Sequence, residues 1–87
     1  MPDLLAEMKA DVVGDKTGLV RELVLLPSRG VIFNGSKPRF LYYEDAHSDL
    51  RNKISLLSDD HYLSEVSTTD TPIFRMSEQF VRLLRAS

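Results

Sequence analysis

Apolar residues near the end of the chain flank the polar run Ser67–Thr71, and this spacing limits the folds that the chain can adopt. Two apolar runs of strand length around a short polar loop are typical of a β-hairpin. Ser77 follows the second run and suits the N-cap of a helix, with Glu78 favourably placed in its first turn. The sequence therefore predicts two closing elements: a β-hairpin about 61–67/72–76 and a helix about 78–85.

Apolar residues at helical spacing predict three further helices upstream. Their expected ranges are about 3–13, 15–26 and 46–58. Gly14 is a suitable end for the first helix, and Asp15 is a suitable cap for the second. The broad apolar face of the helix 15–26 places it at the centre of the core, with Arg21 and Glu22 on its outer side.

The segment 31–43 has a β-like pattern. Asn34 and Gly35 favour a hairpin turn because both tolerate a positive φ, so we expect two strands around a turn. The alternative is one strand with an ordered crossing loop. Together these patterns predict an α+β fold in a single domain, 1–87, because a chain of 87 residues is of one-domain length.

The composition is that of an ordinary globular domain, with 43% hydrophobic and 28% charged residues. There is no cysteine, which excludes a disulfide framework and a thiolate metal site and fits a reducing compartment. The apolar runs are too short to cross a membrane, and the N-terminus is acidic, unlike a signal peptide. We therefore expect a cytoplasmic chain without a membrane span. The net charge of −2 argues against strong non-specific binding to nucleic acid.

The chain contains no pattern of residues that predicts catalysis. His47 and His61 lack a His or Cys partner, so we expect them exposed or capping and predict no metal site. Asp59–Asp60 could form a carboxylate cluster with Glu65 or Asp70, but we expect them to lie on a solvated turn. The glycines do not form a phosphate loop, and the serines stand in no nucleophile elbow. We predict a non-enzymatic protein without a cofactor.

The order of a helix, Tyr62-Leu63, a polar loop, Phe74-Arg-Met-Ser77 and then Phe80-Val-x-Leu-Leu84 resembles a known unit. Over residues 46–84 it is similar to the wing region of winged helix-turn-helix domains of the MarR-like and PadR-like regulators. In those families the strand returning from the wing reads Tyr-Arg-Leu-Thr, and its threonine caps the next helix. The resemblance implies a small winged-helix-like domain in which 46–58 takes the place of the recognition helix.

If 46–58 is a recognition helix, its polar face is the candidate nucleic-acid site. The residues of that face are Ser48, Arg51, Asn52 and Ser55. Arginine and asparagine are the types that read guanine and adenine edges with two hydrogen bonds.

Two other basic patches are candidate interaction sites. Arg29, Lys37 and Arg39 lie beside aromatic residues, a combination that binds single-stranded nucleic acid through phosphate contacts and stacking. The patch near the C-terminus consists of Arg75, Arg82 and Arg85. Its members can pair with Glu78 or with aspartates, or meet an acidic partner.

The charges around the expected wing and recognition helix favour protein contacts over DNA. The wing tip Ser67–Thr71 carries no Lys or Arg, and acidic residues flank 46–58. We therefore predict a winged-helix-like interaction module that acts through protein–protein contacts or self-association. The alternatives are a DNA-binding transcriptional regulator of winged-helix type, and an excised soluble cytosolic domain of a phage or prophage membrane protein of the superinfection-exclusion kind.

Overall fold

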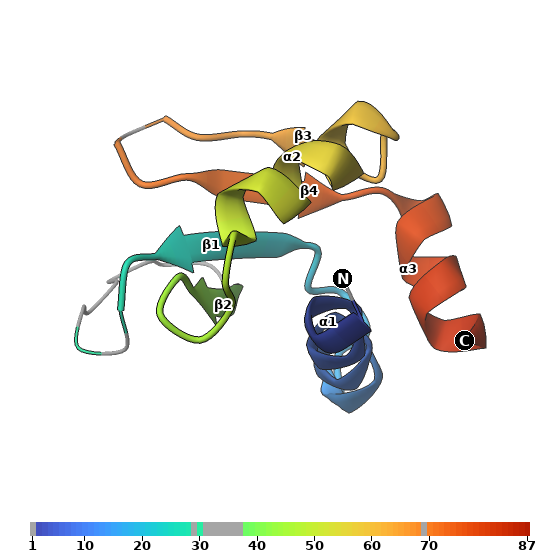
Figure 1. The fold of residues 1–87 in the computed structure, drawn as a ribbon. Helices are drawn as coiled ribbons and strands as arrows, with labels where there is room; N and C mark the ends of the chain where they lie inside the picture. The colour runs from blue at the N-terminus through green and yellow to red at the C-terminus, as the bar shows by residue number, and fades with distance from the viewer. Residues whose placement is uncertain (1, 29, 31–37, 69) are drawn as a thin grey trace.

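The fold consists of a mixed sheet covered on one face by helices (Figure 1). The structure is a computed structural model and describes residues 2–28, 30, 38–68 and 70–87. In this part of the chain it has three helices and four strands, so the predicted α+β class is confirmed. The elements in chain order are α1 (Pro2–Gly14), β1 (Glu22–Leu26), β2 (Phe40–Tyr43), α2 (Leu50–Asp59), β3 (Leu63–Glu65), β4 (Ile73–Met76) and α3 (Glu78–Ala86).

β1 lies in the interior of the sheet, whose strand order is β2-β1-β4-β3. It pairs in parallel with β2 and antiparallel with β4, while β3 and β4 form an antiparallel pair. The hairpin predicted at 61–67/72–76 is therefore confirmed.

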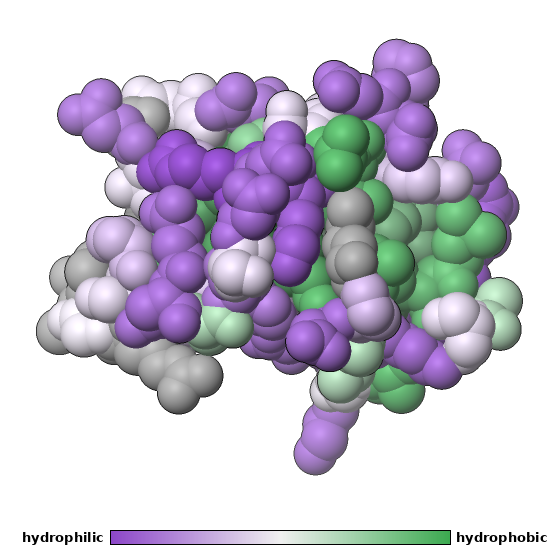
Figure 2. Space-filling view, viewed as in Figure 1, coloured by the Kyte–Doolittle hydropathy of each residue, from purple (hydrophilic) through white to green (hydrophobic). Residues whose placement is uncertain are grey.

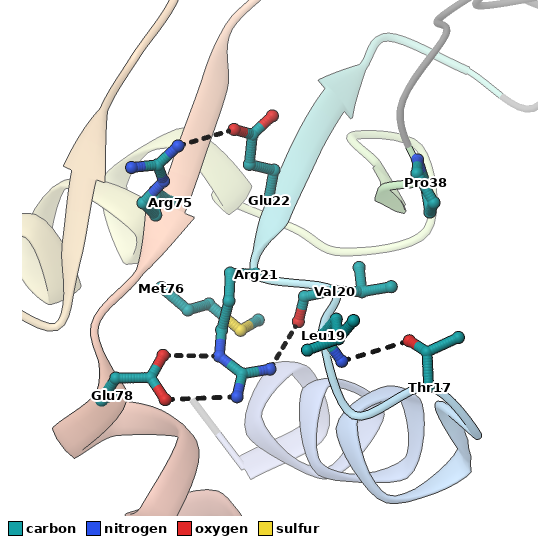
Figure 3. Close-up of a pocket in the computed structure, with 9 residues that line it drawn as sticks. All are labelled: Thr17, Leu19, Val20, Arg21, Glu22, Pro38, Arg75, Met76 and Glu78. Atoms are coloured by element: carbon teal, nitrogen blue, oxygen red, sulfur yellow. Dashed lines mark hydrogen bonds and ion pairs between the residues drawn. The ribbon is translucent and has the colours of Figure 1, made fainter.

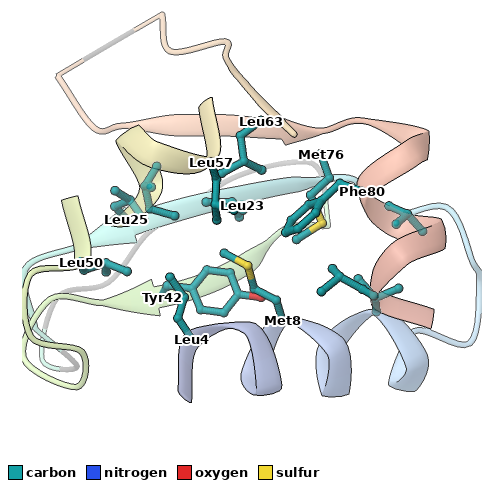
Figure 4. Packing of buried hydrophobic residues seen from close by; sticks show 14 residues of the cluster. Leu4, Met8, Leu23, Leu25, Tyr42, Leu50, Leu57, Leu63, Met76 and Phe80 are labelled. Atoms are coloured by element: carbon teal, nitrogen blue, oxygen red, sulfur yellow. The ribbon is translucent and has the colours of Figure 1, made fainter. Parts of the chain in front are cut away.

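Alternation along the strands divides the buried side chains between the two faces of the sheet. On one face, Leu23 of β1 and Tyr42 of β2 join Leu4 of α1, Leu57 of α2 and Phe80 of α3 in the main core (Figure 4). Because all three helices contribute to this cluster, they cover the same face. On the other face, Val24, Leu26 and Ile73 form a second, smaller cluster.

The helix predicted at 15–26 is wrong, because residues 22–26 form the strand β1. The apolar run that resembles a helix face is instead a strand buried on both sides, which also reads as continuous apolar sequence. Gly18 before it has a φ of +68°, a left-handed conformation that a helix does not contain. Asp15 caps this loop rather than a helix, by accepting the N–H groups of Thr17 and Val20.

The predicted helix 46–58 begins later than expected, at Leu50, because residues 44–49 form turns. Asp49 precedes the helix with a φ of 59°, in the left-handed region. Within the β-like segment, the strand at Phe40–Tyr43 is confirmed, and its partner is β1. The first strand of the expected hairpin, 31–33, and most of its turn lie outside the described residues.

The closing helix is confirmed as α3. The hydroxyl of Ser77 accepts the N–H of Phe80 at 3.1 Å, as expected for an N-cap. The ring of Phe80 stacks on Tyr62 with centroids 5.2 Å apart, which joins α3 to the base of the hairpin. Of the helices in the described ranges, none has the length and apolar character that a membrane span requires.

Polar side chains of α1 reach across the core toward β2 and the turn after it. The Tyr42 hydroxyl donates to Asp11 at 2.8 Å, and its ring is fully buried. His47, expected to be exposed or capping, is instead buried and bonded to Glu7 of α1. Burial raises the pKa of Asp11, and the hydrogen bond from Tyr42 opposes this rise. The hydrogen bond from Tyr42 therefore stabilises the ionised form of Asp11.

We expect Tyr42→Phe to lower the free energy of unfolding at pH 7 by about 1–3 kcal/mol, because it leaves a partly buried carboxylate without its donor. A raised pKa in the folded chain means that protonation of Asp11 favours the fold, so the loss should shrink as the pH falls through that pKa. Urea unfolding at neutral and acidic pH measures both effects. Tyr43→Phe is the matched control, and an equal loss in this variant would contradict the role of the Tyr42 hydroxyl.

Candidate functional site

A cleft of about 570 Å³ opens where β1 begins and β4 ends (Figure 3). This volume lies within the range of roughly 300–1,000 Å³ for ligand sites. The residues that line it are Thr17, Leu19, Val20, Arg21, Glu22, Pro38, Arg75, Met76 and Glu78. The lining thus combines aliphatic side chains with four charged ones.

The loop before β1 exposes the side chain of Leu19 to solvent at this cleft. One carboxylate oxygen of Asp15 accepts the N–H and the hydroxyl of Thr17 at 3.1 and 2.7 Å, and the other accepts the N–H of Val20 at 3.0 Å. Thr17 in turn accepts the N–H of Leu19 at 3.1 Å. The side chain of Leu19 is nevertheless 81% exposed. The loop backbone that leaves Leu19 exposed is therefore held in place by hydrogen bonds.

Glu22, the first residue of β1, lies between two arginines on the face of the sheet away from the helices. It stands directly opposite Arg75 of β4 in the strand register. Its two carboxylate oxygens accept Arg39 Nε at 2.9 Å and Arg75 Nη2 at 3.2 Å. The Glu22 side chain is only 13% exposed, and the paired guanidinium groups offset the cost of burying its charge. The strands β1 and β4, together with the residue that precedes β2, position this triad.

A second ion pair closes the other side of the cleft. Arg21 donates Nε and Nη2 to the two carboxylate oxygens of Glu78 at 2.6 and 3.2 Å, and Nη1 to the Val20 carbonyl at 3.0 Å. The hydrogen bond from Arg21 lowers the pKa of Glu78, and the charges of Arg82 and Arg85 lower it further. Glu78 therefore lies in a locally positive environment.

Two of the residues predicted to bind nucleic acid are hydrogen-bonded to acidic side chains. Arg51 donates to Glu44 at 2.8 Å, and the side-chain amide of Asn52 donates to Asp49 at 3.1 Å. Ser55 lines a smaller pocket together with Arg51, whereas Ser48 lies in the turns before α2. Arg51 and Asn52, two of the side chains expected to contact bases, are thus hydrogen-bonded to carboxylates of the chain itself.

The two other basic patches partly meet at the cleft. Arg29 and Lys37 lie outside the described residues, but Arg39 belongs to the Glu22 triad. Arg75 lines the same cleft. The Arg85 guanidinium lies beside the loop that precedes β1, since a Cβ atom added at Gly18 would be 3.8 Å from it. The sequence did not predict Leu19, Arg21 or Glu22 as site residues, because the expected helix separated them from β4. The signals for the site were Arg39 of the first patch and Arg75 of the C-terminal arginine patch.

A second apolar groove lies between α1 and α3, away from this cleft. Figure 2 shows hydrophobic side chains gathered over α3, whereas those over α2 are mostly hydrophilic. The groove has a volume of about 560 Å³ and includes Leu5, Tyr62 and the half-exposed Leu83. Of the described residues that line it, Lys9 alone has a charged side chain, so side-chain ion pairs like those of the cleft at β1 are absent from this part of the lining.

No protein-family model, curated protein or solved structure matches this chain.

We expect carbon NMR of the side-chain carboxyl groups to find the pKa of Glu78 below the ordinary value for glutamate, because Arg21 stabilises the ionised form. The pair thus favours the fold above the ordinary pKa, and this contribution is lost as the pH falls through the lowered value. Arg21→Gln should raise the pKa of Glu78.

Asp15 provides the internal control for this titration. Its pKa is also lowered, mainly by the hydrogen bond from Thr17, so it should stay low in Arg21→Gln. A pKa of Glu78 that does not change in this variant would contradict the assigned ion pair.

Proposed function

We propose that the chain is a winged-helix-like, non-enzymatic interaction module of the cytoplasm that binds a segment of a protein partner in the cleft at the start of β1. The succession of α2, the hairpin β3–β4 and the capped helix α3 supports the winged-helix-like part of this proposal. The order is that of the unit which residues 46–84 resemble.

The exposed side chain of Leu19 is the single observation that carries the proposal. Burial of a leucine is worth about 1.5–3 kcal/mol, so exposing 81% of this side chain forgoes much of that stabilisation. The loop is fixed by Asp15 and Thr17, so little conformational freedom would be lost on binding. An aliphatic side chain on a fixed backbone, beside Val20 and Met76, is suited to anchoring an apolar side chain of another protein.

The ion pairs of the charged groups favour binding of a protein over catalysis by proton transfer and over recognition of DNA. Arg21, Glu22 and Glu78 are engaged in ion pairs with one another or with Arg39 and Arg75. On α2, the contacts to Glu44 and Asp49 place negative charge where a phosphate backbone would approach. Both arrangements support a protein partner.

Selection from a random-peptide library on the immobilised chain tests this function. We expect enriched peptides to bind the parent chain and to bind Leu19→Ser at least about tenfold more weakly, because the substitution removes an apolar anchor. Leu83→Ser is the matched control, since Leu83 is a half-exposed leucine of the other groove. Peptides that bind Leu19→Ser as well as the parent, or that depend only on Leu83, would contradict the proposal.

Sedimentation equilibrium of the same variants tests whether the partner is a second copy. A dimer that dissociates in Leu19→Ser would identify self-association through the cleft as the protein contact. A dimer that persists in Leu19→Ser and is lost in Leu83→Ser would move the interface to the groove between α1 and α3.

A further inference from the structure

The charge around the cleft is opposite in sign to that of the whole chain. Among the described residues, five arginines, two glutamates and Asp15 lie in or next to it, which gives a local formal charge of +2 against −2 for the chain. The arginines are Arg21, Arg39, Arg75, Arg82 and Arg85, and the glutamates are Glu22 and Glu78. The remainder of the chain is therefore strongly acidic, and the cleft is a positive region within it.

Several of these arginines keep donors available to an incoming group. Arg75 uses one nitrogen for Glu22, and its side chain is 58% exposed. A guanidinium group has five N–H donors, so most of those of Arg75 can still bind an acceptor. The side chains of Arg82 and Arg85 are exposed and form no hydrogen bond or ion pair with another residue in the described ranges.

The internal ion pair of Arg21 and Glu78 shows how a carboxylate binds in this cleft. Both oxygens of Glu78 meet the guanidinium fork, although the Glu78 side chain is 69% exposed. Paired N–H groups in a fixed plane are the geometry that arginine offers to carboxylates. A second carboxylate from outside would meet the same chemistry at Arg75, Arg82 and Arg85.

The lining distinguishes an acidic peptide from a nucleic acid. Among the described residues that line the cleft, the uncharged ones contain no aromatic ring on which a base could stack. Glu22 and Glu78 would also repel a run of closely spaced phosphates, whereas a peptide carries fewer charges, separated by apolar side chains. The aliphatic side chains of Leu19, Val20 and Met76 give such apolar side chains a place to bind.

We infer that the partner is an acidic segment of a protein, with an aliphatic side chain packed against Leu19 and carboxylates bound by Arg75 and by Arg82 or Arg85. This inference rests on the proposed function, since it assigns the chemistry of the partner in the same cleft. Complementary charge of this kind speeds association and excludes basic partners.

The composition of the library-selected peptides tests the acidic partner separately from the proposed protein-binding function. We expect the enriched peptides to contain more Asp and Glu than the library does, next to aliphatic residues, and to bind less well as salt rises. Neutral or basic peptides that still require Leu19 would overturn the acidic partner and leave the protein-contact function standing. If no peptide depends on Leu19, both fail.

Charge variants of the chain then test the arginines with one enriched peptide. Arg75→Gln and Arg82→Gln should each weaken its affinity by up to about fivefold, the range for exposed ion pairs. Arg51→Gln is the matched control, because Arg51 lies on α2 and pairs with Glu44. Equal affinity for the parent, Arg75→Gln and Arg82→Gln would overturn the inference.

Removal of a negative charge from the cleft should have the opposite effect. Glu78→Gln frees the fork of Arg21, so we expect it to bind the acidic peptide several-fold more tightly. Thermal unfolding checks that α3 stays folded, since Glu78 lies in its favourable first turn. Weaker binding by a folded Glu78→Gln variant contradicts the inference, as does displacement of the peptide by a short DNA duplex.

Discussion

Burial of β1 on both faces of the sheet is the constraint on which the rest of the structure depends. Leu23 and Leu25 complete the core beneath the helices, while Val24 and Leu26 form the centre of the smaller cluster behind it. Both neighbouring strands, β2 and β4, are hydrogen-bonded to β1. The strand therefore connects the N-terminal helix, β2 and the closing hairpin into one fold. It also fixes the position of the candidate cleft, which forms at its first residue.

The elements that the sequence predicted correctly are those defined by local signals. The cap at Ser77 and the polar loop Ser67–Thr71 specify the closing helix and the hairpin with little help from distant residues. The run that became β1 lacks such a signal, because consecutive apolar residues fit both a helix face and a fully buried strand. Only its pairing with β2 and β4 decides between them, and a single sequence does not show that pairing.

The candidate cleft illustrates the same limit for a site. Arg75, Arg82 and Arg85 were recognisable as a positive patch, because they are close in the sequence and two of them share a helix face. The ion pairs that form were not, since Arg75 meets Glu22 through strand pairing, and Glu78, expected to pair within the patch, instead pairs with Arg21 from a distant part of the chain. The polar face of α2 stood out more clearly in the sequence, yet Arg51 and Asn52 of that face contact local acidic residues.

The most direct test of the central claim, that the cleft at β1 is the binding surface, is amide NMR of the isotope-labelled chain during titration with an acidic, leucine-containing peptide. The account predicts that the largest shift changes fall in the loop 15–20, at the start of β1 and at Arg75–Glu78, which together enclose the cleft. Shift changes that centre on α2 or on the groove between α1 and α3, or their complete absence, would contradict it.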